Sequence, residues 1–259
     1  MISYCIASYR PAYSKRLVND LIKKTSVPFE ILIWLNVDDC KFERFLGDKK
    51  AGGVPIKIID KTPANIGMTA YIELFRKSQY EIIVQIDDDV ICISREIAQR
   101  ALEIFNRFKR VKQLTADVWQ DEYTTGARPP LSAYKLFNRQ YGLYNGPIDG
   151  WFSLYHRSIL PLILDVPVSR YFPLGGVVKN RLKKQGLYGL LCTGFKVFHV
   201  IGPIYANYFG MLDFEIQKYK ELGRYDIVEW YQKDKENLPA PEQLSVLIDG
   251  IIKHLDQFS

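Results

Sequence analysis

The chain has 259 residues, of which 47% are hydrophobic and 25% are charged. Such proportions are typical of a globular protein, and they exclude a disordered or fibrous chain. The formal net charge of +6 suits nucleic acid, anionic lipid or a phosphate-bearing substrate alike, but the basic residues are scattered and carry no nucleic-acid-binding motif. We therefore expect no nucleic-acid partner.

No segment predicts a membrane span or a cleaved leader. The longest apolar runs, such as Ile2 to Ala7 and Phe29 to Leu35, are far shorter than the roughly 20 residues of a spanning helix, and the first strand begins at once. A cytoplasmic location is therefore expected, with contact at a membrane surface left open. The cysteines are far apart and lack metal or redox spacing, so we expect buried, reduced thiols at Cys5, Cys40, Cys92 and Cys192.

The first half alternates short apolar runs with amphipathic segments, which is typical of parallel strands joined by crossover helices. Buried strands are predicted over Ile2 to Ala7, Phe29 to Leu35, Val54 to Ile59 and Glu81 to Ile86. Helices are predicted to begin at Pro11, after Gly67 and after Ser94, which is a good N-cap residue.

In the second half of the chain, the regular spacing of apolar residues is interrupted. Strands are predicted over Val111 to Val118, Trp151 to Tyr155 and Phe195 to Ile201, a short helix over Val177 to Gln185, and helices from Leu212 onward. The segment Gln120 to Pro147 fits no regular period, and long irregular segments inside a domain are usually functional loops. We expect this loop to become ordered when a ligand binds, with Trp151 and one or two loop tyrosines contacting a second substrate.

Three adjacent carboxylates, Asp87, Asp88 and Asp89, follow a buried strand at the place where α/β folds usually hold their ligand. Such close like charges repel, and a hard divalent cation with oxygen ligands would balance them. A cation here would clamp a diphosphate, and Asp87 and Asp89 are the candidates for holding it. The alternative is a solvated turn that merely favours aspartate.

The order of several segments over residues 1 to 203 resembles that of an inverting family 2 type glycosyltransferase of the GT-A fold. Ala7-Ser8-Tyr9-Arg10-Pro11 is similar to the first nucleotide-binding turn of that family, and Asn65-Ile66-Gly67 to its Asn-x-Gly element. Phe29 to Asp39 resembles its second strand, although Asn36 stands where the family more often has aspartate. Asp87-Asp88-Asp89 is similar to its Asp-x-Asp motif.

The resemblance implies an α/β fold with a mixed, Rossmann-like sheet flanked by helices. It implies a catalytic domain over 1–205, with a nucleotide-sugar half at 1–93 and an acceptor half at 94–205, followed by a helical extension over 206–259. That extension is expected to pack on the domain, with a dimer contact or a membrane-surface helix as alternatives. The oligomeric state stays undecided.

The implied activity is transfer of a sugar from a nucleotide-diphospho-sugar, with a UDP-sugar favoured, to a saccharide or lipid-linked acceptor. The implied cofactor is Mn²⁺ or Mg²⁺, held by Asp87, Asp89 and a late histidine that His199 matches, although a lone histidine in an apolar strand is otherwise a core residue. The implied donor contacts are Ala7, Ser8, Tyr9, Arg10, Asn36, Asp38, Asn65, Gly67, Asp87 and Asp88.

One element of the family is missing. An inverting transfer needs a carboxylate base, and the usual Glu-Asp pair should fall near Phe172 to Lys179, where this chain has Pro173-Leu174-Gly175-Gly176. Asp149, in a glycine-flanked turn, is the nearest substitute. Asp213 and Glu215 are the other options, and an Asx turn is the structural alternative for Asp149.

Two other functions compete with the transferase. A non-catalytic module that binds a nucleotide-sugar or a glycan is favoured by the missing acidic pair, and the intact aspartate run argues against it. A sugar-phosphate nucleotidyltransferase usually carries a glycine-rich loop after the first strand, and Ala7 to Pro11 contains no glycine.

Overall fold

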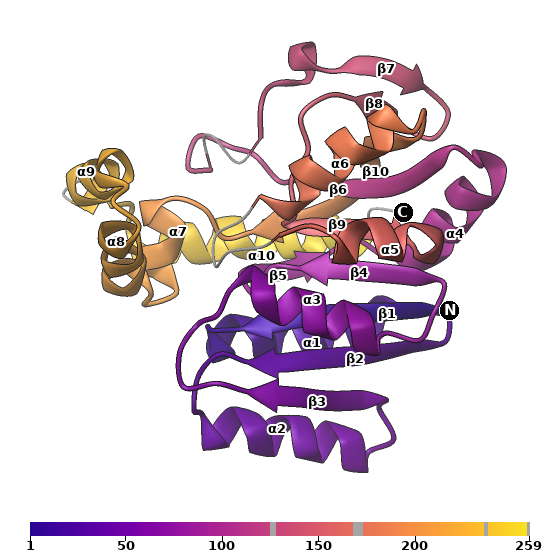
Figure 1. The fold of residues 1–259 in the computed structure, drawn as a ribbon. Coiled ribbons are helices and arrows are strands. Elements are labelled where there is room, and N and C mark those ends of the chain that lie inside the picture. The colour runs from indigo at the N-terminus through magenta and orange to yellow at the C-terminus, as the bar shows by residue number, and fades with distance from the viewer. Residues whose placement is uncertain (125–127, 168–172, 236–237, 258–259) are drawn as a thin grey trace.

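A ten-stranded mixed sheet organises the chain, in a computed structural model that describes residues 1–124, 128–167, 173–235 and 238–257 (Figure 1). Its strand order is β3-β2-β1-β4-β9-β6-β10-β8-β7, and β5 pairs with β10 off this path. The strands are β1 (Ile2–Ser8), β2 (Phe29–Leu35), β3 (Ile56–Lys61), β4 (Ile82–Ile86), β5 (Val90–Ile93), β6 (Val111–Val118), β7 (Lys135–Asn138), β8 (Leu143–Asn145), β9 (Phe152–His156) and β10 (Tyr188–His199).

Strands β1 to β4 are parallel, whereas β9 is antiparallel to both of its neighbours, β4 and β6. The helices among the described residues are α1 (Pro11–Lys24), α2 (Cys40–Ala51), α3 (Met68–Lys77), α4 (Ile97–Arg107), α5 (Leu160–Leu164), α6 (Leu174–Lys184), α7 (Pro203–Tyr208), α8 (Leu212–Glu221), α9 (Tyr225–Asp234) and α10 (Pro241–Gln257). Short 3-10 turns occupy Leu131–Ala133 and Arg157–Ile159.

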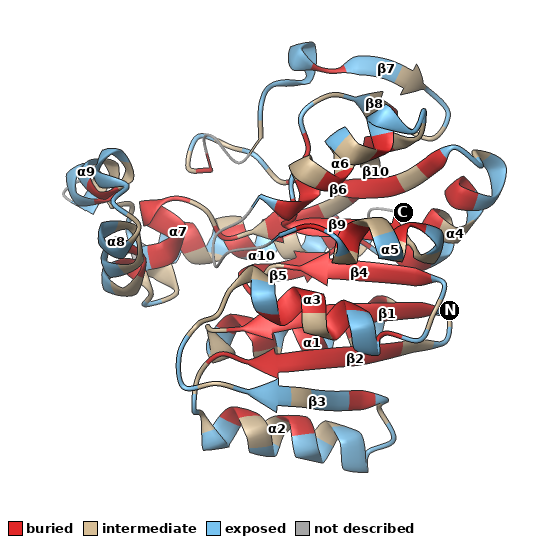
Figure 2. Cartoon of the chain, viewed as in Figure 1, coloured by how far each residue is buried: buried red, intermediate tan, exposed pale blue. Residues whose placement is uncertain are grey.

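Two apolar layers enclose the central strands. One core cluster joins alternate residues of β1, β2 and β4 to α1, α2 and α4, and a second joins the opposite faces of the strands to α3, α5 and α6. The largely apolar sequences of β1, β2 and β4 are therefore explained, because each strand is buried on both faces (Figure 2). Both layers hold the carboxyl ends of β1 and β4 together, and α7, α8 and α9 lie beyond those ends, at the left in Figure 1.

The predicted mixed α/β fold is confirmed, with corrections in detail. Ser94 does not cap a helix, because α4 begins later, after Glu96, and Ser94 Oγ instead accepts a hydrogen bond from the backbone N–H of Lys196 at 3.1 Å. This bond ties β5 to β10. Strand β5 and the helices α2 and α5 were not predicted.

The segment Gln120 to Pro147 is less irregular than predicted, since it contains β7 and β8, which form a hairpin at the sheet edge. Residues 125–127 of this segment lie outside the described residues, as does Phe172 in the region of the missing acidic pair. The prediction of a sugar contact at Trp151 is wrong. Its ring is buried in the core and its Nε1 donates to the carbonyl oxygen of Ala116 at 2.7 Å. Cys40 is exposed at the start of α2, whereas the other three cysteines are buried as expected.

The last helix, α10, packs on the sheet through one apolar face. Leu244, Ile248, Ile251 and Leu255 form a core cluster with residues of β5, β10 and α7. No helix within the described ranges is both long and apolar enough to cross a membrane.

A buried lysine anchors α10 to α1. The ammonium group of Lys24 lies 2.9 Å from Asp20 of its own helix and 2.9 Å from Asp256 of α10, and its side chain is fully buried. Lys24→Met is expected to lower the free energy of unfolding by about 3 kcal/mol, because two carboxylates lose their counter-charge in a poorly solvated place. Denaturant unfolding measures this loss.

Lys23→Met is the matched control for that prediction. Lys23 neighbours Lys24 and reaches the same Asp256 at 3.7 Å, but it is largely exposed. Its removal is expected to change stability by less than about 1 kcal/mol, since exposed ion pairs contribute little. Equal effects of the two substitutions would contradict the anchoring role of Lys24.

Candidate functional site

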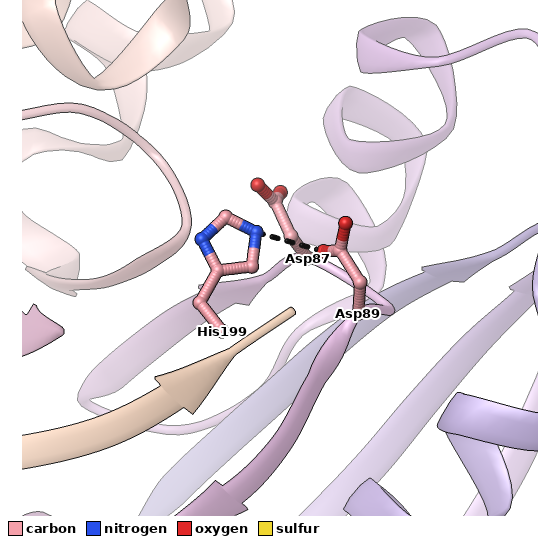
Figure 3. Close-up of side chains that lie close together, drawn as sticks. All are labelled: Asp87, Asp89 and His199. Atoms are coloured by element: carbon pink, nitrogen blue, oxygen red, sulfur yellow. Dashed lines mark hydrogen bonds and ion pairs between the residues drawn. The ribbon is translucent and has the colours of Figure 1, made fainter. Parts of the chain in front are cut away.

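Asp87, Asp89 and His199 converge at the carboxyl ends of the central strands (Figure 3). Their nearest carboxylate and imidazole atoms all lie within 4.8 Å of one another. Asp87 and Asp89 follow β4, while His199 ends β10, and the backbone N–H of Val200 donates to the carbonyl oxygen of Asp89 at 2.9 Å. The pairing of β10 with β5 therefore brings His199 to the aspartates.

Asp88 holds the turn after β1. Its Oδ2 accepts hydrogen bonds from the backbone N–H groups of Tyr9 and Arg10, each at 2.6 Å, and its Oδ1 accepts from the guanidinium of Arg10 at 3.0 Å. The same guanidinium reaches Asp89 at 2.5 Å and Glu215 of α8 at 2.8 Å. Arg10 thus joins the turn, the aspartate run and the C-terminal helices.

The electrostatics of the three aspartates differ because their partners differ. Burial and the charge of Asp89 raise the pKa of Asp87 to about 7. Burial by itself would raise the pKa of Asp89, but the charges of Arg10 and His199 hold this pKa well below the usual range. Burial alone would lower the pKa of His199, and the adjacent Asp89 raises it instead. Asp89 is therefore the permanently ionised member of the cluster.

Two adjoining cavities, of about 220 and about 380 Å³, open on either side of these carboxylates. The first is lined by eight of the ten predicted donor contacts, with additional residues of α3 and α8: Ala7, Tyr9, Arg10, Asn36, Asn65, Gly67, Met68, Tyr71, Asp87, Asp88, Lys218, Tyr219 and Leu222. The two remaining predicted contacts lie elsewhere. Ser8 is buried and bonds Ser14 at 2.7 Å, while Asp38 is exposed outside the cavity.

The neutral end of the first cavity is made by two asparagines. Asn36 Oδ1 accepts from the backbone N–H of Ile66 at 3.2 Å, and Asn65 Oδ1 accepts from that of Gly67 at 2.8 Å. Gly67 has φ +56° and ψ −127°, a conformation open only to glycine, and α3 begins at the next residue. The turn therefore brings backbone close to the cavity without a side chain in the way.

Sequence reasoning missed Lys218 and Tyr219, which line both cavities from α8. The ammonium group of Lys218 pairs with Glu215 one turn earlier and lies 4.4 Å from the centre of the Tyr219 ring. A basic residue in an amphipathic helix is an ordinary surface pattern, so nothing local marked it. The only signal was the choice of Asp213 and Glu215, on the same helix, as alternative candidates for the base.

Asp149 lies against α6, the helix that would carry the missing acidic pair. A side chain at Gly175 would have its Cβ 2.6 Å from the backbone carbon of Asp149, so the turn itself fills that place. Burial raises the pKa of Asp149, opposed by hydrogen bonds from the backbone N–H groups of Gly150 and Gly176. The charge of Asp149 is among those that raise the pKa of Asp87, and the residue itself is exposed to solvent.

Of the two other candidate bases, Glu215 is engaged by cations on both oxygens, Arg10 on one and Lys218 on the other. Asp213 is exposed and pairs with Lys235 at 3.4 Å. Asp149 is therefore the candidate base whose carboxylate faces no paired cation among the described residues.

Comparison with proteins of known structure identifies the fold. No family model matches the sequence, and no curated protein is detectably similar to it. Solved structures match with TM-scores of 0.55 for S. aureus TarS 1-349 with UDP-GlcNAc, 0.59 for the mannosyltransferase PcManGT from Pyrobaculum calidifontis with GDP-Man and Mn²⁺, and 0.60 for GalNAc-T7 with UDP, GalNAc and Mn²⁺.

The sequence identities are 13%, 12% and 13%, and the matches cover 79%, 93% and 78% of this chain, in the same order. The matches extend over 60%, 66% and 44% of those proteins, so the chain spans less than two thirds of each. The fold is that of the GT-A glycosyltransferases, as the resemblance implied. At these identities the likeness establishes the fold, and the activity has to be argued from the site.

Proposed function

We propose that the protein is a metal-dependent glycosyltransferase that moves a sugar from a nucleotide-diphospho-sugar to a saccharide or lipid-linked acceptor. The observation that carries the proposal is the cluster of Asp87, Asp89 and His199 at the edge of a cavity lined by the predicted donor contacts. The folds matched above include proteins solved with UDP-GlcNAc and with GDP-Man and Mn²⁺, which supports the same ligand class here.

The cluster fits a divalent cation. Oxygen and nitrogen ligands about 2.1 Å from an ion lie at most about 4 Å apart across it, close to the spread of the three side chains. His199 Nδ1 is buried without a hydrogen-bond partner among the described residues, and Nε2 faces Asp89 at 2.9 Å. Four carboxylates meet here, Asp87, Asp88, Asp89 and Glu215, against the permanent cations Arg10 and Lys218, so a divalent ion would balance the remaining charge.

When bound, a Mn²⁺ or Mg²⁺ ion would supply charge neutralisation for the diphosphate leaving group. The residues of the chain place the donor around it. The cavity end at Asn36 and Asn65 accepts the base, for which we propose uracil, and the end at Arg10, Asp87 and Lys218 faces the diphosphate. Tyr9 and Tyr219 also line this cavity, and their aromatic rings could contact the base or the sugar.

The proposed reaction is inverting. The acceptor hydroxyl oxygen attacks the anomeric carbon, the bond from that carbon to the diphosphate oxygen breaks, and the hydroxyl proton passes to Asp149. A carboxylate in this role must be ionised before the attack. Its pKa should also lie close to neutral pH, so that it can accept the proton. The raised pKa of Asp149 and its charge interaction with Asp87 support that role.

Calorimetric titration with UDP, GDP and dTDP, each with and without Mn²⁺, tests the proposal. We expect metal-dependent binding of one nucleotide, UDP. If the folded protein binds none of the three nucleotides, the proposed transferase function is wrong. If binding needs no metal, the proposed cation site is wrong.

Lys218→Gln is expected to weaken nucleotide binding by roughly 10- to 100-fold, because a charge-assisted contact to a diphosphate contributes about 1.5 to 3 kcal/mol. Lys220→Gln, on the exposed face of the same helix, is the matched control and is expected to bind as the wild type does. The same calorimetric titration measures both, with thermal unfolding as the check on folding. Equal affinities of the two variants would place Lys218 outside the donor site.

A further inference from the structure

A further cavity, of about 210 Å³, lies where β6 and β10 begin, at the opposite end of the sheet from the aspartates. Its lining comes from the end of α6, the start of β10, the end of β8 and the residue before β6: Arg110, Asn145, Lys179, Lys183, Gly186, Leu187, Tyr188 and Gly189. Three cations face it and none of the lining residues carries a carboxylate.

The backbone fixes the cations in this cavity. Lys179 Nζ donates to the carbonyl oxygen of Gly146, and Arg110 Nε donates to that of Gly186 at 2.8 Å. Two glycines make room for these side chains. A Cβ at Gly189 would lie 3.2 Å from Cγ of Lys179, and Gly186 has φ +69°, with its Cβ position 3.2 Å from Arg110 Nη2. The chain therefore leaves space for converging positive charges.

The charges are not compensated within the cavity. Burial and the nearby charge of Lys183 lower the pKa of Lys179, and no ion pair joins Lys179 to a carboxylate among the described residues. Cations in the last turn of a helix interact favourably with the helix dipole. This interaction accounts for both Lys183 and Lys184 at the end of α6. The dipole does not account for Lys179, which lies before the last turn, nor for Arg110, which comes from another element.

We propose that this cavity binds a phosphoryl group, carried either by a soluble sugar phosphate or by a lipid headgroup. Arg110, Lys179 and Lys183 would surround the phosphate oxygens, and Asn145 would add a neutral contact at the rim. Asn145 lies four residues before Asp149, and the loop between them passes Lys179 at Gly146. The binding does not require the transferase activity proposed above.

The test titrates the full chain in EDTA, without nucleotide, using inorganic phosphate and glucose 1-phosphate in a calorimeter, and vesicles containing phosphatidic acid in a sedimentation assay. Lys183→Gln is the main variant, because Lys183 is exposed and its loss leaves the core intact. Lys184→Gln is the matched control, since it removes the same charge from the adjacent position outside this cavity.

We expect phosphate or glucose 1-phosphate to bind at least about fivefold more weakly to Lys183→Gln, while Lys184→Gln stays within about twofold of the wild type. Binding of the soluble compounds alone identifies a free sugar phosphate as the source. Sedimentation with vesicles that soluble phosphate reverses, and that Lys183→Gln loses, identifies a headgroup. Equal losses in the two lysine variants, no binding of any probe, or a loss in Lys218→Gln but not in Lys183→Gln would overturn the site.

Discussion

Replacing Asp89 by asparagine is expected to abolish metal-dependent nucleotide binding and to lower sugar transfer by at least about 1000-fold, roughly 4 kcal/mol of transition-state stabilisation. Asp89 is the cluster member held ionised by Arg10 and His199, so it supplies the fixed negative charge that a divalent cation needs. An asparagine keeps the shape and removes that charge. Calorimetric titration of Mn²⁺ and then of UDP measures both losses directly.

Asp48→Asn is the control for this experiment, because Asp48 is exposed on α2 and lines neither cavity at the aspartates. It is expected to bind Mn²⁺ and UDP as the wild type does. If Asp89→Asn is folded by circular dichroism and still binds UDP in a Mn²⁺-dependent way, the ion is held elsewhere and the proposed centre is wrong.

The second large effect is expected at Asp149. Asp149→Asn should lower kcat by about 100- to 10,000-fold, the usual contribution of a positioned general base, and leave the affinity for UDP and Mn²⁺ unchanged. The separation follows from the structure, since Asp149 lies outside both cavities at the aspartates. Asp165→Asn, which removes an exposed carboxylate paired with Arg181, is expected to retain full activity.

The pH profile adds an independent readout for the same residue. A base acts when ionised, so kcat should fall as the pH drops through the pKa of Asp149. Burial raises that pKa, which moves the acidic limb above the range of an ordinary aspartate. The limb should be absent from the residual rate of Asp149→Asn. Full kcat in this variant would return the role to Asp213 or Glu215.

The fold was predictable where the sequence pattern was local and continuous. Strand β2 was predicted with the bounds it has, because a segment that is apolar except for Glu30 lies between Pro28 and Asn36. The first half of β10 was missed, since Gly189 and Gly194 interrupt its apolar pattern. Ser94 was misassigned for a related reason: its hydroxyl satisfies a strand partner instead of a helix end, and only the tertiary pairing decides between them.

The candidate site was predictable as far as its residues follow strand ends. Asp87, Asp89 and His199 were expected as metal ligands, and the structure brings them together, although their role as ligands stays a prediction. Lys218 was not predictable, because α8 reaches the site through contacts such as that between Glu215 and Arg10, which are 205 residues apart. No local pattern specifies such a contact.

The salt bridges of Arg10 also have a consequence for how the protein matures. The guanidinium of Arg10 forms ion pairs with Asp88 and Asp89, which follow β4, and with Glu215 of α8. A nascent chain in which α8 has not yet been synthesised therefore lacks one of the acidic partners of Arg10. The two cavities also lack their α8 wall until then. The proposed nucleotide site is therefore complete only after α8 has been synthesised, and a nucleotide bound there would in turn stabilise the docked helix by mass action.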